Sequence, residues 1–546
     1  MKRLRSLAGL TGAALLMAIP YAAAPAQAAV PKQVDSAVIV TESLPLGHFV
    51  TAVAIKYTTR VDTLGAPVPT SAFTVVGTRT SSVNGAVTTA PRTVVRAYTN
   101  DEPERAAQGT RGKYLILELS TDDANAGALQ YTGGINNPYQ LSYSVTQTAD
   151  VLDARGRLEL AASALPVTTT STVTPIVDDF LAATFTSTAG QALNYRLFVP
   201  EAYRDKPRAK TFYPMVVFLH GGGERGLNNL SQITANQGAT AFADPSRQAT
   251  DPSFVLAAQV PAPPAGQGWT TPAIQAALIQ LIDSLVADYP VDPDRLYLTG
   301  LSLGGIGSFD ILPRYPTKFA GAIIIAASGD PARMPLMKDV PIWVTHSVDD
   351  PTVSYTNGSL RLVNALEAAG SVVVRDTWPG NLPEPEADAR ALALWQQAQA
   401  AGSHTLFTTY AAGTTPVSAH WSWVPTYLND TMIDWLYAQE RANGASCDAT
   451  VRTSSWSGGF SGAVVVTNTG TKPIADWTVS WQAGAGQQVT SAWPGTLSQS
   501  GTTVTVSAPA FSSSIQPGKS LSIGFNATGT AGTSAPAVTV NGAVCG

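Results

Sequence analysis

Short runs of alternating apolar and polar residues dominate the first third of the chain. Residues 51–55, 113–119 and 140–145 are three of these runs, and clusters of Gly, Pro and Asn separate them. A period of two places apolar side chains on one face of a strand, which is typical of a sheet with one buried face. Residues 30–175 are therefore predicted to form an antiparallel β-sandwich.

The pattern changes in the middle of the chain, where continuous apolar runs alternate with helix-length segments. The apolar runs are residues 215–219, 295–299, 321–325 and 341–345. Strands buried on both faces of a parallel sheet carry such continuous runs. Between them, residues 273–289 and 360–369 have helical spacing. Residues 176–443 are therefore predicted to form a mainly parallel sheet flanked by helices.

After a short connection, residues 447–546 return to strand-like sequence rich in Thr, Ser, Gly and Val, which predicts a second β-sandwich. The chain has 2 cysteines, Cys447 and Cys545, and they bracket this segment. In an oxidising compartment, a disulfide bond that closes the segment is the simplest interpretation. A length of 546 residues favours two to four domains, because one hydrophobic core rarely organises so long a chain.

The N-terminus carries Lys2, Arg3 and Arg5, followed by an apolar run from Leu7 to about residue 20 and by Ala-Gln-Ala at residues 26–28. This arrangement is typical of a signal peptide, which we expect to span residues 1–28. A membrane anchor is the alternative, but the apolar run is shorter than a bilayer span. We therefore expect a secreted, extracellular protein.

The charge balance argues against several classes of partner. The chain has 33 Lys and Arg against 38 Asp and Glu, and only 13% of its residues are charged. Nucleic-acid binding depends on clustered positive charge, so we expect no nucleic acid as partner. No second apolar stretch follows the first, so we expect no membrane partner. Neither a metal nor a cofactor is predicted from the sequence.

A candidate nucleophile lies in the pentapeptide Gly-Leu-Ser-Leu-Gly at residues 300–304, directly after an apolar run. The small flanking residues let the chain turn sharply, so that the serine hydroxyl projects above the edge of the sheet. The pattern alone is weak in a chain with 46 glycines. A strand before it and a helix after it make a functional origin the better interpretation, and Ser302 is predicted to be the nucleophile.

A serine nucleophile needs a histidine base within hydrogen-bonding reach, and the chain has 5 histidines. His48 belongs to the N-terminal segment and is expected to lie remote from the site. His220 and His346 each end a predicted strand, which favours a role in supporting loops. His404 precedes the last predicted strand of the middle segment, whereas His420 follows it. Parallel sheets place active sites at the carboxyl ends of their strands, so His420 is the predicted base.

The imidazole also needs an acid. In hydrolases whose serine follows a strand of a mainly parallel sheet, the acid lies between the serine and the histidine along the chain. Asp349 and Asp350 both follow the predicted strand at residues 341–345. We favour Asp350, with Asp349 as a loop cap or turn residue. Two backbone N–H groups must stabilise the oxyanion. We predict those of Leu303 and Gly222, although the glycines at residues 221–223 are also compatible with an ordinary turn.

The sequence Phe-Leu-His-Gly-Gly-Gly-Glu-Arg-Gly at residues 218–226 resembles the oxyanion loop of secreted bacterial esterases of the α/β-hydrolase superfamily that have an immunoglobulin-like N-terminal domain. In that family, and in related feruloyl esterases and polyhydroxyalkanoate depolymerases, the acid loop has the pattern His-Gly-x-x-Asp-x-x-Val. Residues 346–353 are similar, which maps the acid onto Asp350, with Ser347 in place of the usual glycine. The resemblance covers roughly residues 30–443 and implies an immunoglobulin-like fold for the first sandwich.

Four tryptophans in the last segment suggest a surface for glycans, because flat aromatic faces stack on sugar rings. Trp477 and Trp481 lie within an alternating strand and are expected in the core. Trp456 and Trp493 lie beside glycine or proline in predicted turns, where a wholly buried tryptophan is less natural.

The whole segment from Cys447 to Cys545 resembles a family-2 carbohydrate-binding module, most clearly in Trp-Ser-Gly-Gly-Phe at residues 456–460 and Gly-Phe-Asn at residues 524–526. The resemblance implies binding to cellulose through Trp456, Trp493 and Phe511, the last in place of a third tryptophan. Gly459 matches the cellulose-type subgroup, so a cellulose surface is the expected partner and xylan the second choice.

The sequence thus predicts a carboxylic ester hydrolase that works through an acyl-enzyme at Ser302. Anchoring on plant cell wall favours acetyl or feruloyl esters of its polysaccharides as the ester substrate. A polyester depolymerase or a serine peptidase on the same triad is the alternative within catalysis. A binding protein with an inert middle domain is the alternative from another class. For the N-terminal sandwich, the sequence leaves open whether it covers the cleft, supports oligomers or spaces the domains.

Overall fold

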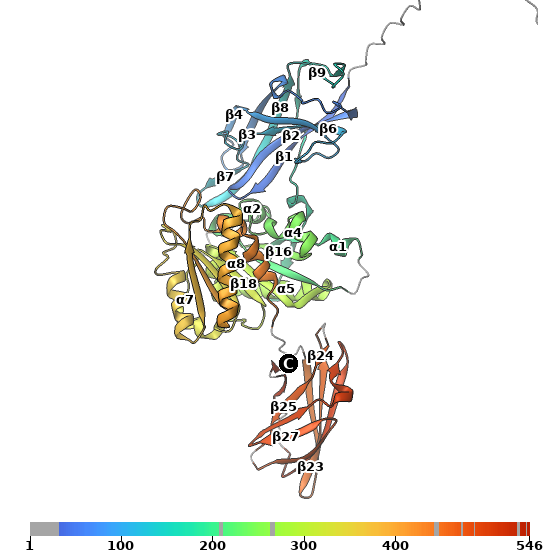
Figure 1. Cartoon of the computed structure of the whole chain (residues 1–546), viewed down its shortest axis with the longest axis vertical. Helices are drawn as coiled ribbons and strands as arrows, with labels where there is room; N and C mark the ends of the chain where they lie inside the picture. The colour runs from blue at the N-terminus through green and yellow to red at the C-terminus, as the bar shows by residue number, and fades with distance from the viewer. Residues whose placement is uncertain are drawn as a thin grey trace, which may run out of the picture.

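The computed structural model describes residues 32–206, 211–262, 268–441, 447–470, 473–484, 486–531, 536–541 and 543–545. The predicted signal peptide lies outside the described residues. Within them, no helix combines the length and the apolar character that crossing a bilayer requires. Figure 1 shows a strand-rich body at the N-terminal end, a mixed body of helices and strands, and a second strand-rich body that ends the chain.

The N-terminal sandwich consists of two five-stranded sheets. The first has the order β12-β1-β2-β6-β5, and the second has the order β11-β8-β3-β4 with β7 paired to β8. Their bounds are β1 Val34–Leu44, β2 Gly47–Val61, β3 Phe73–Ser81, β4 Val87–Arg92, β5 Val94–Asn100, β6 Gly112–Leu119, β7 Leu129–Thr132, β8 Ile135–Gln147, β11 Ser163–Thr168 and β12 Ser171–Val173. A short pair, β9 Val151–Leu152 and β10 Leu158–Leu160, lies apart. Val53 and Leu117 from one sheet and Val145 from the other share its core, as an immunoglobulin-like sandwich requires.

The middle domain has one nine-stranded sheet with the order β13-β14-β16-β15-β17-β18-β19-β21-β20. The strands from β16 to β20 in this order pair in parallel, and β13 and β14 add an antiparallel edge. The bounds are β13 Phe180–Thr186, β14 Ala192–Phe198, β15 Tyr213–Leu219, β16 Phe254–Gln259, β17 Val291–Leu301, β18 Gly321–Ile325, β19 Ile342–Ser347, β20 Val373–Trp378 and β21 Thr405–Tyr410. The predicted mainly parallel sheet is confirmed, whereas the antiparallel edge was not predicted.

Helices cover both faces of this sheet. Their bounds are α1 Glu201–Arg204, α2 Ser231–Thr234, α3 Thr240–Ala243, α4 Pro245–Thr250, α5 Pro272–Asp288, α6 Leu303–Ile311, α7 Ser359–Ala368, α8 Glu384–Ala401, α9 Trp423–Tyr427 and α10 Asp430–Tyr437. Along β15, Val217 packs in one core with α5, α6 and α7, and its neighbour Phe218 packs in the other with α3, α8 and α10. Burial on both faces is therefore the reason for the continuous apolar runs.

The C-terminal sandwich consists of two main sheets, with the orders β22-β23-β30-β26 and β27-β28-β25-β31-β32. A short separate sheet pairs β24 with β29. The bounds are β22 Cys447–Trp456, β23 Gly459–Asn468, β24 Ile474–Ala475, β25 Thr478–Gln482, β26 Gln488–Trp493, β27 Thr496–Ser500, β28 Thr503–Ser507, β29 Ser514–Ile515, β30 Ser520–Thr528, β31 Val538–Val540 and β32 Ala543–Val544. Trp477 and Trp481 are buried in its core, as predicted. The predicted disulfide bond between Cys447 and Cys545 is present.

The N-terminal sandwich packs directly on the middle domain, where Figure 1 shows β7 and the end of β1 close to the helices. Ser43 at the end of β1 donates from its hydroxyl toward the carbonyl oxygens of Thr234 and Asn236, at 3.3 and 3.1 Å. In the opposite sense, the hydroxyl of Ser231 donates to the carbonyl of Asn136 in β8 at 2.8 Å. These contacts attach two segments of the sandwich, the β1–β2 turn and the β7–β8 hairpin, to the middle domain.

The disulfide bond closes a loop of 98 residues around the C-terminal core. Replacing Cys447 and Cys545 by Ser restores the conformational freedom of the unfolded segment, so we expect its free energy of unfolding to fall by about 4 kcal/mol. Calorimetric unfolding of the wild type and the double variant measures this, with reductant added to the wild type as a control. Equal unfolding temperatures for the C-terminal transition would contradict the prediction.

Candidate active site

Ser302 occupies a sharp turn between β17 and α6. Its backbone has a φ of 52°, a conformation that non-glycine residues rarely adopt, and its N–H donates to the carbonyl of Ile325 at 3.0 Å. The turn brings α6 against the neighbouring strand, since a β-carbon at Gly304 would lie 1.9 Å from the carbonyl oxygen of Leu219. Glycine is therefore required at position 304, and the serine is held at the carboxyl edge of the sheet.

The structure brings the three residues of the predicted triad together. Ser302 Oγ lies 3.0 Å from His420 Nε2, and His420 Nδ1 lies 2.8 Å from Asp350 Oδ2. An ionised carboxylate only accepts hydrogen bonds, so Nδ1 carries the proton and Nε2 is free to accept one from the serine hydroxyl. This is the protonation state that a base beside a serine nucleophile needs.

The carboxylate of Asp350 is held from several sides. Its Oδ1 accepts the backbone N–H groups of Thr352 and Val353 at 2.8 and 3.0 Å. Burial raises the pKa of Asp350, but hydrogen bonds from His346, His420 and the loop outweigh it and lower the pKa below its ordinary value. Asp350 is therefore ionised at neutral pH. Its neighbour Asp349 is exposed and accepts the N–H of Gly413 at 2.8 Å, which fits the predicted loop-cap role.

Ser347, which replaces the usual glycine of the acid loop, links that loop to the histidine loop. Its N–H donates to Ser422 Oγ at 3.1 Å, and the two hydroxyl oxygens lie 3.0 Å apart. Both side chains are fully buried. Beyond Ser422, the ring of Trp423 lies edge-on to His420 with a centroid distance of 5.3 Å. The hydroxyl of Ser347 therefore adds a contact between the acid loop and the histidine loop that glycine could not make.

The two predicted oxyanion donors flank Ser302. Leu303 is the first residue of α6, directly after the serine, and Gly222 lines the same pocket as Ser302. The preceding His220 is fully buried, accepts the N–H of Val260 on Nε2 at 3.0 Å, and donates from Nδ1 to the carbonyl of Gly221 at 2.7 Å. His220 therefore supports the loop, as predicted. The donor roles of Gly222 and Leu303 stay predictions.

Both domains line the pocket above Ser302, which has a volume of about 630 Å³. The middle domain contributes Ser302 and His420 among others, and the N-terminal sandwich contributes His48 from β2 and Tyr131 from β7. The expectation that His48 lies remote from the site is therefore wrong. Distance along the chain misled it, because the packing of the sandwich on the middle domain carries the β1–β2 turn to the pocket.

The loop with the predicted oxyanion donor is also in contact with the sandwich. Glu224 Oε1 accepts from Asn136 Nδ2 of β8 at 3.0 Å, while its Oε2 is buried without a hydrogen-bond partner. Burial raises the pKa of Glu224 to about 7, and the hydrogen bond from the side chain of Asn136 offsets only part of this effect. A β-carbon at Gly223 would lie 2.8 Å from Asn136 Nδ2, so the sandwich lies directly against the loop. No pattern in the sequence indicates this contact.

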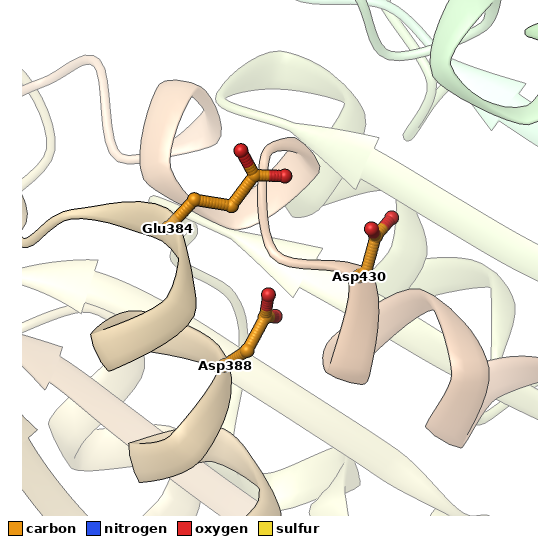
Figure 2. Close-up of side chains that lie close together, drawn as sticks. All are labelled: Glu384, Asp388 and Asp430. Carbon is orange, nitrogen blue, oxygen red and sulfur yellow. The ribbon is translucent and has the colours of Figure 1, made fainter.

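A separate group of carboxylates occurs in the first turns of α8 and α10. Figure 2 shows Glu384, Asp388 and Asp430 directed toward one another. Asp430 accepts from Arg247 Nη2 at 2.6 Å, and Asp388 accepts the backbone N–H of Thr431 at 3.1 Å. These contacts explain two of the three carboxylates as an ion pair and a helix contact, and we assign no metal to the group.

The two predicted glycan-stacking tryptophans are half exposed, at 53% for Trp456 and 52% for Trp493. Each ends a strand rather than lying in a turn. Trp456 pairs with Gly459 of β23, Trp493 pairs with Gly524 of β30, and Gly524 pairs with Ala463 of β23. Gly459 and Ala463 are four residues apart on one strand, so both tryptophans lie on the same outer face of the sheet. The side chain of Phe511, within Ala510–Ser512, lies outside what the structure describes.

The raised pKa of Glu224 predicts a stability that depends on pH. Between the ordinary value of 4.5 and about 7, the folded state binds more protons than the unfolded state, so stability falls as pH rises through this window. In Glu224→Gln, the decrease in the free energy of unfolding across this pH window should be smaller by about 3 kcal/mol. Denaturant unfolding between about pH 5 and 7.5 measures it, with Glu386→Gln on the exposed side of α8 as control. An unchanged slope in Glu224→Gln would contradict the prediction.

Two family models match the ends of the chain. The model described as "Esterase Ig-like N-terminal domain" matches residues 36–159, and the model described as "Cellulose binding domain" matches residues 445–545. A crystal structure of a thermostable esterase is 32% identical, with 74% of this chain and 100% of that chain covered and a TM-score of 0.62.

Curated relatives match over shorter stretches. Endoglucanase B of Cellulomonas fimi is 47% identical over 102 residues, which are 18% of this chain and 10% of that protein. Chitinase C of Streptomyces lividans is 42% identical over 78 residues, which are 14% of this chain and 13% of that protein. This chain therefore spans only about a tenth of the length of these relatives. With the full-length match to the thermostable esterase, the chain belongs to the family of α/β-hydrolase esterases with an immunoglobulin-like N-terminal domain, here joined to a cellulose-binding module.

Proposed function

We propose that the protein is a serine esterase in which Ser302 is the nucleophile, His420 the general base and Asp350 the acid partner. The observation that carries the proposal is the unbroken chain of hydrogen bonds from Ser302 Oγ through the imidazole to the carboxylate, at 3.0 and 2.8 Å. It lies at the carboxyl edge of the sheet, beside a pocket of about 630 Å³ that can hold a substrate.

In the first half-reaction, Ser302 Oγ attacks the ester carbonyl carbon while His420 Nε2 takes the hydroxyl proton. The carbonyl oxygen becomes an oxyanion, for which the N–H groups of Gly222 and Leu303 are the proposed donors. The carboxylate of Asp350 stabilises the imidazolium. The C–O bond to the alcohol then breaks, and the proton on Nε2 passes to the leaving oxygen, which leaves an acyl-enzyme.

In the second half-reaction, water enters as the alcohol leaves. His420 Nε2 removes a proton from the water, whose oxygen attacks the acyl carbon and forms a second oxyanion. This intermediate releases the carboxylic acid, and the proton returns from His420 to Ser302 Oγ. All steps use protein side chains and backbone groups, so the proposal invokes neither metal nor cofactor.

The C-terminal module is proposed to hold the enzyme on cellulose. Trp456 and Trp493 lie on one outer sheet face, where their rings are available for stacking on a glucan surface, and Phe511 is the proposed third contact. Anchoring on plant cell wall fits acetyl or feruloyl esters of its polysaccharides as substrates. The disulfide bond fits the proposed secretion, since such bonds persist in oxidising compartments.

Ser302→Ala tests the proposed chemistry. We expect kcat/KM for 4-nitrophenyl acetate to fall by roughly 10³-fold or more, because no other group can form the acyl-enzyme. A fluorophosphonate should label the wild type with one equivalent and leave the variant unlabelled. The control variant Ser308→Ala, which changes a buried serine of α6, should still be labelled. Hydrolysis by Ser302→Ala at the wild-type rate would refute the proposal.

Comparison of kcat/KM for acetylated xylan, methyl ferulate, polyhydroxybutyrate and peptide anilides identifies the natural class of substrate. Higher kcat/KM on the polyester or the anilides than on both cell-wall esters would retain the triad but reject the proposed substrate.

A double variant, Trp456→Ala with Trp493→Ala, tests the anchor. Loss of both stacking faces should lower the fraction of protein bound to microcrystalline cellulose by roughly tenfold or more, since each stacked ring contributes on the order of 1 kcal/mol. Sedimentation with cellulose, insoluble xylan and chitin measures binding, and calorimetric unfolding checks that the module is folded. Unchanged retention on cellulose in a folded variant would disprove the role of this face.

A further inference from the structure

Two imidazoles contact the carboxylate of Asp350, and the proposed mechanism uses only one of them. His346 Nε2 lies 3.1 Å from Asp350 Oδ2, the same oxygen that His420 Nδ1 approaches at 2.8 Å. The side chains of His346 and Asp350 are both fully buried. A second donor on an oxygen that already serves the proposed base is a contact that merely filling the core would not require.

The surroundings of His346 fix which of its nitrogens carries a proton. Its Nε2 faces two acceptors, the carboxylate of Asp350 and the carbonyl oxygen of Val353 at 3.0 Å, so Nε2 must be a donor. On the other side, Nδ1 lies 2.8 Å from Ser359 Oγ, which also approaches the carbonyl oxygen of Ala327 at 3.1 Å. Contacts on both edges therefore hold the ring in one orientation, with its donor directed at Asp350.

We propose that His346 is a positioning residue for the triad. It donates from Nε2 to Asp350, which keeps the carboxylate ionised and fixes the oxygen that orients His420. The inference rests on the proposed roles of Ser302, His420 and Asp350. His346 touches neither Ser302 nor the substrate pocket, so it acts through Asp350 alone.

Loss of the His346 donor should shift the pH dependence of kcat/KM in a direction that electrostatics predicts. The groups that face Asp350 are the imidazoles of His346 and His420 and the backbone N–H groups of Thr352 and Val353. Without the His346 donor, the carboxylate is less stabilised and its pKa rises. Its charge also acts more fully on His420, which favours the imidazolium. This second effect moves the acid limb of kcat/KM, which reports protonation of the base, toward higher pH.

Two isosteric amides separate positioning from packing. In His346→Asn, the side-chain amide occupies the position of Nδ1 and can retain the contact with Ser359, but the donor to Asp350 is lost. In His346→Gln, the amide reaches the position of Nε2 and can retain that donor. His404→Asn, at the exposed start of β21, is the matched control. The measurement is the pH dependence of kcat and KM for 4-nitrophenyl acetate with the full-length protein, together with active-site titration by fluorophosphonate.

For His346→Asn we expect the acid limb to move up by about one pH unit, which lowers kcat/KM on that limb roughly tenfold while KM changes little. His346→Gln should stay close to the wild type, as should His404→Asn. Equal profiles for the Asn and Gln variants, an unmoved limb or a shift to lower pH would overturn the inference, because a packing role does not distinguish the two amides in this way. Full activity of Ser302→Ala in the same assay would instead refute the proposed function on which the inference rests.

Discussion

The candidate active site depends on the sharp turn between β17 and α6, where Ser302 has a φ of 52°. β17 lies at the centre of the sheet, between β15 and β18, so the turn projects a hydroxyl at the middle of the carboxyl edge. Parallel strands end at the same edge, and the loops after β15, β19 and β21 therefore deliver the glycine run, the acid and the histidine to one place. The strain of the turn is tolerated because Gly304 lets α6 pack closely against β15.

Much of this arrangement could be predicted from the sequence because it is local or follows from strand direction. Continuous apolar runs located the parallel strands, and their ends located Ser302, Asp350 and His420. The antiparallel edge was missed because β13 and β14 have partly exposed faces and polar residues interrupt their apolar runs. The contact of His346 with Asp350 was missed because a strand-end histidine can point to either side, and only the packed rotamer decides which.

The contribution of the N-terminal sandwich was also hidden from the sequence. His48 and Asn136 belong to a different domain from Ser302, and their place at the pocket depends on how two folded bodies dock. The sandwich therefore borders the pocket and contacts the loop at residues 221–224, which agrees with the first of the roles that the sequence left open. The tryptophan face belongs to the C-terminal module, so the proposed anchoring and the proposed catalysis use different surfaces of the protein.

The central claim is that Ser302, His420 and Asp350 act together on an ester carbonyl. A crystal structure of the protein after reaction with a phosphonate ester tests it most directly, because the adduct mimics the tetrahedral intermediate. The account predicts phosphorus bonded to Ser302 Oγ and a phosphonyl oxygen within hydrogen-bonding distance of the N–H groups of Gly222 and Leu303. An adduct on another residue, or an oxygen directed away from both N–H groups, would contradict it.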